Sequence, residues 1–172
     1  MTCLPSVRRA GPNDAAAILG IFDAVARECP WLIYVPGQRR PADLLPALQA
    51  PDSLTTYWLA PAEGVPMAAL EIAQSALPAL AHTATFGMAV LAAARRRGYG
   101  RALVRTAEAW AGERGVRKVT IVCAATNAPA LRLYDACGYT GEGAQHHQFR
   151  LQGRWVDALW LAHWIKEAPC ED

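Results

Sequence analysis

Residues 90–103 decide the interpretation of this chain, and they read VLAAARRRGYGRAL. A predicted strand over Thr83–Val90 precedes them, and a predicted amphipathic helix over Gly100–Arg114 follows them. The positive end of the helix dipole disfavours each nearby cation by about 0.3–1 kcal/mol. Backbone N–H groups at a helix start bind anions, and glycines let a ligand approach closely. We therefore expect this turn to bind an anionic group that compensates four arginines: Arg95, Arg96, Arg97 and Arg101.

Two familiar phosphate-binding loops do not fit this turn. The dinucleotide pattern G-x-G-x-x-G needs a glycine where Leu103 stands, and no acidic residue ends a following strand. The Gly-Lys-Ser/Thr end of a Walker A loop is also missing. A solvated basic turn is the alternative interpretation of any arginine cluster, but the strand-turn-helix setting favours an anion site.

The other predicted elements place the turn in a mixed sheet. Strands are predicted over residues 7–10, 55–60, 67–73, 83–90, 118–124, 139–149 and 155–165, with a loop of several residues at 61–64 and a turn near 152–153. Helices are predicted over 15–28, 42–49, 100–114 and from Pro129 to Gly138, whereas 29–40 is expected to be irregular. This order predicts an α/β (α+β) fold, with a mixed, mostly antiparallel central sheet of about seven strands and helices on both faces.

The composition indicates a single domain over residues 1–172. With 53% hydrophobic and 19% charged residues and a net charge of +2, the chain is too apolar for disorder and too balanced for a broad nucleic-acid surface. Its five cysteines are scattered without a C-x-x-C pair, which argues against a disulfide framework or a zinc site. The longest mostly apolar run, Phe86–Ala94, is shorter than the roughly 18 residues that span a bilayer. We expect a cytoplasmic protein without a membrane or nucleic-acid partner.

The chain resembles the GNAT N-acetyltransferase superfamily in two sequence patterns, which follow one another in the same order as in that family. Residues 95–100 match Q/R-x-x-G-x-G/A, the pyrophosphate loop of that family. Residues 127–139 match its second signature, N-x-x-A-x-x-L-Y-x-x-x-G-F/Y. The resemblance covers residues 6–165, although 29–55, the region that carries substrate specificity in the family, matches only in general character. It implies a GNAT-like fold in which two parallel strands, ending near Val90 and Ala124, splay apart to form a cofactor cleft.

The resemblance implies acetyl-coenzyme A as the acetyl donor. Backbone N–H groups from Arg96 to Arg101 would hold its pyrophosphate, and a backbone N–H near Val90 would stabilise the oxyanion. Asn127 would bond the pantetheine arm, and Tyr134 would protonate the departing thiolate as general acid. The cofactor-binding residues that the resemblance implies are Met88, Ala89, Val90, Arg95, Arg96, Arg97, Gly98, Tyr99, Gly100, Arg101, Asn127, Ala130 and Tyr134. The alternative for Tyr134 is an ordinary core aromatic.

The general base is open at this stage. An alkylammonium group has a pKa of about 10.4 and must lose a proton before it attacks. Many relatives carry a carboxylate on the strand before the pyrophosphate loop, but residues 82–87 contain none. Glu71 on the preceding strand is the best carboxylate candidate, acting directly or through water, and His82 is the second. Ordinary surface roles explain both residues equally well.

The acceptor is expected to be a small amine or an amino-acid-like molecule. Residues 153–157, G-R-W-V-D, are similar to a G-x-W-x-D segment of phosphinothricin-type acetyltransferases, and Trp31 and Tyr34 are candidates to line the acceptor site. Core packing explains Trp155 and the later tryptophans Trp160 and Trp164 equally well. His146 and His147 do not predict a metal site, because adjacent strand residues point to opposite faces and no third ligand is obvious.

Three functions remain open from the sequence. The first is an acetyl-CoA-dependent N-acetyltransferase that transfers the acetyl group directly to an amine. The second is an acetyl-CoA sensor without turnover, which the missing strand carboxylate leaves open. The third is a nucleic-acid-binding module in which the arginines contact phosphates and Tyr99 stacks on a base. Because dimers are common among the relatives, the resemblance also leaves a homodimer open.

Overall fold

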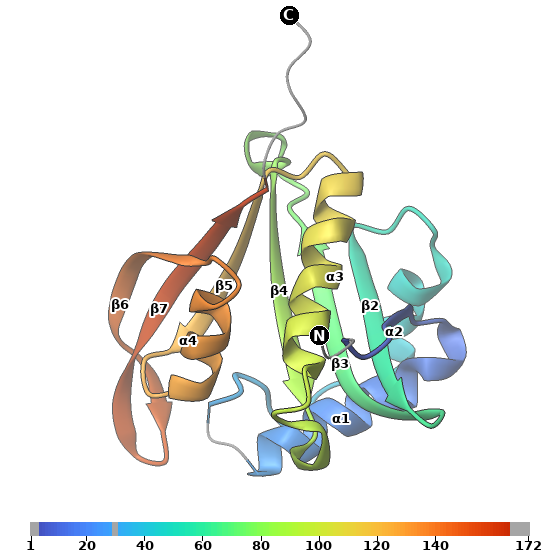
Figure 1. Ribbon diagram of the computed structural model, residues 1–172, viewed down its shortest axis with the longest axis horizontal. Coiled ribbons are helices and arrows are strands. Elements are labelled where there is room, and N and C mark those ends of the chain that lie inside the picture. The colour runs from blue at the N-terminus through green and yellow to red at the C-terminus, as the bar shows by residue number, and fades with distance from the viewer. Residues whose placement is uncertain (1–3, 29–30, 166–172) are drawn as a thin grey trace, which may run out of the picture.

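A seven-stranded sheet forms the centre of the molecule, with helices on both of its faces (Figure 1). The computed structural model describes residues 4–28 and 31–165. In chain order the elements are β1 (Arg8–Arg9), α1 (Ala15–Glu28), α2 (Pro41–Gln49), β2 (Thr55–Ala62), β3 (Val65–Gln74), β4 (Thr83–Val90), α3 (Tyr99–Glu113), β5 (Lys118–Ala124), α4 (Ala128–Asp135), β6 (Thr140–Leu151) and β7 (Arg154–Trp164). The strands lie in the order β1-β2-β3-β4-β5-β7-β6, and only β4 and β5 are parallel. The predicted mixed, mostly antiparallel sheet is therefore confirmed.

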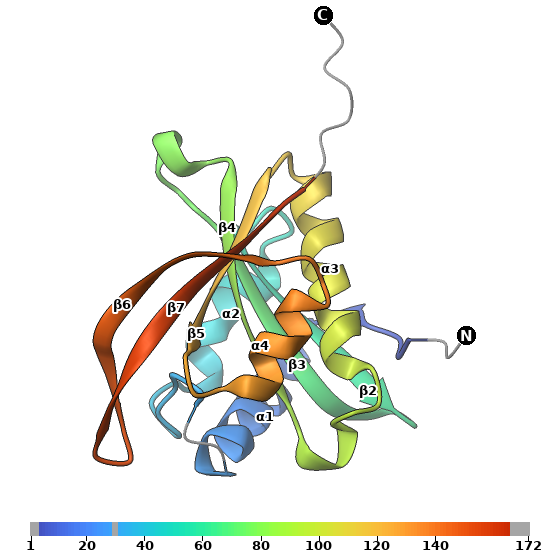
Figure 2. The same cartoon turned by 60° about the vertical axis from the view of Figure 1, so that its left-hand side comes forward.

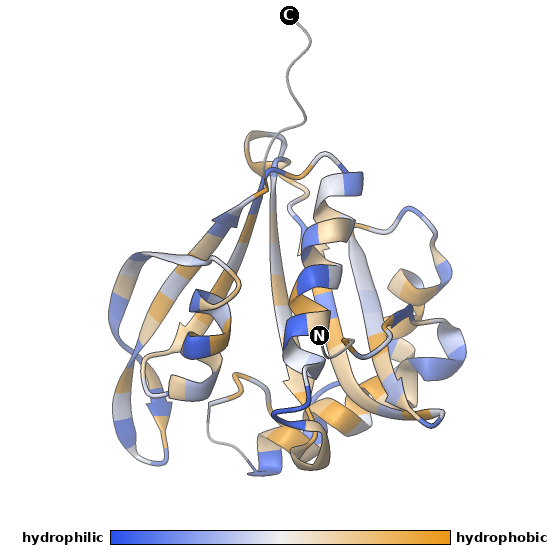
Figure 3. Cartoon of the chain, viewed as in Figure 1, coloured by the Kyte–Doolittle hydropathy of each residue, from blue (hydrophilic) through white to orange (hydrophobic). Residues whose placement is uncertain are grey.

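One hydrophobic cluster lies on each face of the sheet. Helices α1 and α2 pack on alternate residues of β2, β3 and β4, among them Leu59, Ala69 and Ala89. Helix α3 and Tyr134 of α4 pack on the opposite face, against Phe86 and its neighbours. The side of α3 that points away from the sheet carries hydrophilic residues, as Figure 3 shows. Successive strand residues point to opposite faces, so a residue's place in the strand fixes which cluster it joins.

The two parallel strands separate after a short shared stretch. Residues 83–85 of β4 pair with residues 118–120 of β5, but β4 continues to Val90 and β5 to Ala124. The hydroxyls of Thr85 and Thr120 lie 2.8 Å apart where the pairing ends. In Figure 1 the strands meet near the top of the view and diverge below it. The predicted splay is confirmed, and we call this opening between β4 and β5 the fork.

Local differences from the sequence prediction have simple causes. The first strand is only Arg8–Arg9, because β2 pairs with those two residues alone. The loop predicted to take several residues between β2 and β3 is a two-residue turn, with positive φ at Glu63 and Gly64. A register shift beside Pro61 lets β2 run on to Ala62 although proline lacks an N–H for the ladder. Helix α3 begins at Tyr99, one residue earlier than predicted.

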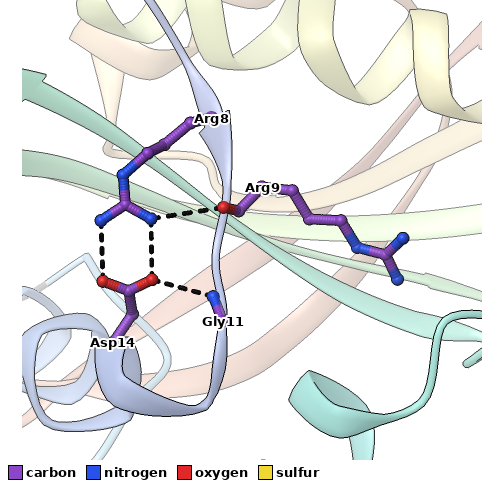
Figure 4. Close-up of polar contacts among 4 residues, drawn as sticks. All are labelled: Arg8, Arg9, Gly11 and Asp14. Atoms are coloured by element: carbon purple, nitrogen blue, oxygen red, sulfur yellow. Dashed lines mark hydrogen bonds and ion pairs between the residues drawn. The ribbon is translucent and has the colours of Figure 1, made fainter.

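A polar cluster joins β1 to the start of α1 (Figure 4). The Arg8 guanidinium donates to both carboxylate oxygens of Asp14, at 2.7 Å each. The same carboxylate accepts a 2.8 Å bond from the Gly11 backbone N–H. The hydrogen bonds from Arg8 hold the pKa of Asp14 below its usual value. The chain entry into α1 is therefore tied to the edge of the sheet by an ionised carboxylate.

The β6–β7 hairpin extends away from the rest of the sheet (Figure 2). Strand β7 pairs with β5 along seven residues, whereas most of β6 is exposed. None of the helices within residues 4–28 and 31–165 is long and apolar enough to cross a membrane.

Candidate functional site

A cavity of about 1180 Å³ occupies the fork and runs between the two faces of the sheet. One end is lined by the arginine-glycine turn at the start of α3. The other end is lined by β3, the end of α1 and residues 31–34 and 38–39 of the following segment. The two ends therefore place the predicted donor residues and the predicted acceptor residues on one continuous space.

The arginine-glycine turn has the backbone shape of an anion-binding loop. Arg96 and Gly98 both have positive φ, at 63° and 88°, and helix α3 starts directly after Gly98. Gly100 packs closely on α4, because a Cβ there would lie 2.8 Å from the Leu133 side chain, which would have to shift. Arg96, Gly98, Gly100 and Arg101 line the cavity. The exposed N–H groups of a helix start thus face a space that arginines of the same turn also border.

Three residues of the predicted cofactor set are placed differently from the others. Arg97 does not line the cavity, and its guanidinium contacts the Ala93 carbonyl oxygen at 3.5 Å. Tyr99, the first residue of α3, is buried in the core and also does not line the cavity. Arg95 lines the cavity, but its guanidinium makes a two-point ion pair with Glu28, at 2.6 and 3.0 Å. The side chains of Arg96 and Arg101 are therefore the better candidates for direct contact with a phosphate.

The free half of β4 supplies a strand edge along the cavity. Met88, Ala89 and Val90 line it and lie beyond the last residue that pairs with β5. An unpaired strand edge presents N–H and C=O groups that an extended ligand can bond like a further strand. The Val90 carbonyl accepts a 3.1 Å bond from Arg95 Nε, which links the strand end to the turn.

Tyr134 lies at the narrow part of the fork. It is 5% exposed, lines the cavity, and packs edge-on against Phe86 with ring centroids 6.0 Å apart. Burial raises the pKa of its phenol above the ordinary value of about 10, so the hydroxyl keeps its proton at neutral pH. Asn127 and Ala130 also line the cavity, and Asn127 Oδ1 accepts the Ala130 N–H at 3.3 Å, which caps α4. The cap stabilises the first turn of α4, the helix that carries Tyr134.

A buried thiol also borders the fork, at Cys123 of β5. Burial raises its pKa to about 11. Because the thiolate is the nucleophilic form, Cys123 is a poor nucleophile near neutral pH.

Glu71 lies at the acceptor end, within a network of charged and polar side chains. Its carboxylate accepts a 2.7 Å bond from Arg39 and a 3.1 Å bond from the Tyr57 hydroxyl. Arg39 also donates to the Tyr57 hydroxyl at 2.5 Å, and burial raises the Tyr57 pKa to about 12. Trp31 and Tyr34 line the same end of the cavity. His82, the second candidate base, lies before β4 and does not line the cavity.

Glu71 and Tyr134 lie on opposite faces of the sheet. Glu71 shares the α1 face with Ala69, two residues away on β3, whereas Tyr134 packs on the α3 face against Phe86. The fork connects the two faces. The two side chains therefore border one cavity from opposite faces of the sheet.

The G-x-W-x-D segment has a structural explanation at its aspartate. Asp157 accepts from the His147 backbone N–H at 2.8 Å and pairs with His146 Nδ1 at 2.9 Å. These bonds hold an irregular stretch of β6, where the ladder shifts register between Gln145 and Phe149. The part of the chain that the structure describes contains no group of three His, Cys, Asp or Glu side chains arranged to hold a metal. Core packing does not explain Trp155, Trp160 and Trp164, which are 62%, 37% and 58% exposed.

Sequence reasoning missed three residues that shape the site. Arg39 belongs to the segment predicted only as irregular, and no periodicity marks it as a cavity residue. Glu28 reads as a helix-end residue, and its contact with Arg95 spans 67 positions of sequence. Gly87 reads as one residue of a strand, although it lies in the cavity wall opposite Glu71.

Comparison with known proteins assigns the chain to a family. A model of the acetyltransferase (GNAT) family matches residues 21–139. Since this match spans more than half of the 172 residues, the chain belongs to the acetyltransferase (GNAT) family. A comparison with curated proteins finds no match.

Solved structures share the fold along nearly the whole chain. An acetyltransferase of the GNAT family from Streptococcus pneumoniae superposes with a TM-score of 0.85 at 20% identity, over 94% of this chain and 99% of that one. A GCN5-related N-acetyltransferase from Kribbella flavida gives 0.79 at 26% identity, over 92% and 96%. A phosphinothricin acetyltransferase from Sinorhizobium meliloti, solved in complex with acetyl-CoA, gives 0.84 at 19% identity, over 100% and 93%. The family resemblance predicted from residues 95–100 and 127–139 is therefore confirmed.

Proposed function

We propose that this protein transfers an acetyl group from acetyl-CoA directly to a primary amine of a small or amino-acid-like molecule. One observation carries the proposal: a single cavity joins an anion-binding turn to a carboxylate, and it passes the buried phenol of Tyr134. The donor and acceptor sides lie on opposite faces of the sheet and meet in the fork.

The donor end fits the chemistry of a coenzyme A molecule. The turn around Arg96 and Gly98 offers helix-start N–H groups and positive charge to a pyrophosphate. The free edge of β4 at Met88–Val90 offers main-chain groups to the amides of a pantetheine arm. The complex of the Sinorhizobium meliloti acetyltransferase with acetyl-CoA supports the same donor for this chain.

The residues around the fork supply the proton transfers that the reaction needs. Glu71 removes a proton from the ammonium form of the acceptor, directly or through water, so that the neutral amine attacks the thioester carbon. A backbone N–H near Val90 stabilises the negative charge that develops on the thioester oxygen. Tyr134, whose phenol is protonated at neutral pH, donates its proton to the leaving thiolate. The proton that the acceptor nitrogen loses as the amide forms passes to solvent, and Tyr134 regains its own proton from solvent.

Transfer is direct rather than through an acetylated enzyme. A covalent route needs a nucleophile in the cavity wall, and Cys123 is a candidate by position. Because burial raises the Cys123 pKa to about 11, its thiol keeps its proton near neutral pH.

The proposal is tested first by ligand binding. Acetyl-CoA is expected to raise the thermal unfolding temperature, whereas NAD and ATP at the same concentration are expected to leave it unchanged. An unchanged unfolding temperature at millimolar acetyl-CoA would contradict the proposed donor. Transfer is then measured as release of the CoA thiol with a panel of the twenty amino acids, 2-phenylethylamine and putrescine.

A further inference from the structure

Gly87 lies directly opposite Glu71 in the antiparallel β3–β4 ladder. Residues paired in this way point to the same face of the sheet, with Cβ positions about 4.5–5.5 Å apart. Both residues line the cavity, and both lie on the face that α1 covers. The space beside the Glu71 side chain is therefore the space that a side chain at position 87 would fill.

That space is open. A Cβ built on Gly87 has no atom within 4 Å apart from its own chain neighbours. Gly87 also lies two residues beyond Thr85, the last residue of β4 that pairs with β5, so the opening is at the fork itself. Neither a positive φ nor a close contact demands glycine here, since Gly87 is absent from the positive-φ glycines. The missing side chain instead leaves open space in the cavity wall between Glu71 and the free half of β4.

The Glu71 carboxylate is held by two hydrogen-bond donors in the wall of the cavity that Gly87 also lines. One oxygen accepts from Arg39 and the other from Tyr57. The Arg39 side chain is 32% exposed and Glu71 is 31% exposed, so both reach the cavity. The segment that carries Arg39 is itself tied to α1, because the Gly37 N–H donates to Asp23 Oδ1 at 3.1 Å.

We propose that the space over Gly87 is the subsite for the acceptor's amino group, and that Arg39 is the residue that positions Glu71 toward it. The inference rests on the proposed acetyl transfer and assigns its acceptor side to named atoms. The amine enters between Glu71 and the fork, gives a proton to the carboxylate, and attacks across the position of Gly87. The expected ligand is a primary amine with only small groups next to its nitrogen. The space left by the missing side chain at Gly87 has room for a small group only.

The substitution Gly87→Val tests the subsite without disturbing the fold. Valine suits a strand, and no neighbouring atom lies where its Cβ would be. We expect transfer to the best amine of the panel to fall at least hundredfold, while the Kd for acetyl-CoA changes less than twofold. Gly143→Val on the exposed strand β6, which also has open space, is the matched control and should keep wild-type transfer.

The outcomes separate the subsite from the function on which it rests. Undiminished transfer by the Gly87→Val variant, with normal thermal unfolding, would overturn the subsite alone. Failure of the wild-type protein to acetylate any amine of the panel would overturn the proposed function together with it. Loss of acetyl-CoA binding in the Gly87→Val variant would also contradict the subsite, because it would place Gly87 on the donor side.

The role of Arg39 is tested by comparing kcat with the Kd for acetyl-CoA. We expect Arg39→Gln to lower kcat about tenfold while the Kd for acetyl-CoA stays within twofold, because the carboxylate loses its fixed orientation. Arg39→Lys, which keeps the charge, should recover part of the loss. Loss confined to acetyl-CoA affinity, or equal loss in the lysine variant and the glutamine variant, would contradict the positioning role.

Discussion

Arg95 and Glu28 form a two-point ion pair, at 2.6 and 3.0 Å, that joins the arginine-glycine turn to the last residue of α1. The pair explains how a cluster of arginines is tolerated at the start of α3. One of the positive charges is matched within the chain, and the rest remain beside the cavity or on the surface. The pair also connects the donor turn to the helix whose residues line the acceptor end of the cavity.

The arginines of the turn are expected to differ in their contribution to acetyl-CoA affinity. Arg101 lines the cavity at the helix start, and loss of a hydrogen bond to a charged group costs about 1.5–3 kcal/mol. Arg101→Gln should therefore raise the Kd for acetyl-CoA roughly tenfold or more, measured by isothermal titration calorimetry. Arg95→Gln should raise it less than threefold, because Glu28 already holds that guanidinium. Equal effects in the two variants would contradict this division.

Removal of the Tyr134 hydroxyl should lower kcat without changing the affinity for acetyl-CoA. The phenol lines the fork and stays protonated, so Tyr134→Phe removes a proton donor while the ring keeps its contact with Phe86. General acid catalysis contributes about 10²–10⁴-fold, so kcat should fall by about that factor in steady-state kinetics. The Kd for acetyl-CoA should stay unchanged. A variant with full activity would show that another group protonates the thiolate.

Gly98 should be intolerant of a side chain. Its φ of +88° is unfavourable for any other residue, at a cost of about 1–2 kcal/mol, and a Cβ there would lie 3.3 Å from Leu4 and Pro5. Gly98→Ala is therefore expected to lower both the free energy of unfolding and the affinity for acetyl-CoA. Gly20→Ala in α1 is the control, since that glycine has open space and ordinary helical φ. A gain of stability in the Gly98→Ala variant would contradict the assigned backbone shape.

Asp14 should stabilise the fold in a pH-dependent way. Its pKa is lowered in the folded state by Arg8, so its contribution is present above the unfolded pKa of about 3.9 and is lost as the pH falls through the lower folded value. Asp14→Ala should cost about 1 kcal/mol at pH 7, as for the loss of a helix cap, and less at pH 3. Urea unfolding at the two pH values measures the difference. Asp135→Ala, which removes an exposed carboxylate, is the control.

The sequence predicted the backbone elements at the proposed donor side of the site better than the contacts at the proposed acceptor side. Residues 95–100 and 127–139 are contiguous patterns whose spacing depends on local backbone, so their elements and the splay of β4 and β5 could be anticipated. The proposed acceptor side is assembled from β3, β4 and the segment after α1. Arg39 and Glu71 are 32 positions apart, and their pairing depends on tertiary packing that no local pattern encodes.

Exposed residues were also harder to interpret than buried ones. The tryptophans of β7 fit a core by composition, but the strand lies in a part of the sheet where their side chains remain exposed. Gly87 carries no side chain, so the sequence alone does not indicate a role for it. Its proposed role depends on its pairing with Glu71 on the neighbouring strand.

The central claim is tested most directly by incubating the protein with acetyl-CoA and the amine panel and measuring both products of the same reaction. Mass spectrometry detects the N-acetylated amine, and a thiol reagent detects free CoA. We predict one equivalent of amide for each equivalent of CoA released, with at least one amine of the panel. Binding of acetyl-CoA without formation of any amide would contradict the claim and would favour the alternative of an acetyl-CoA sensor.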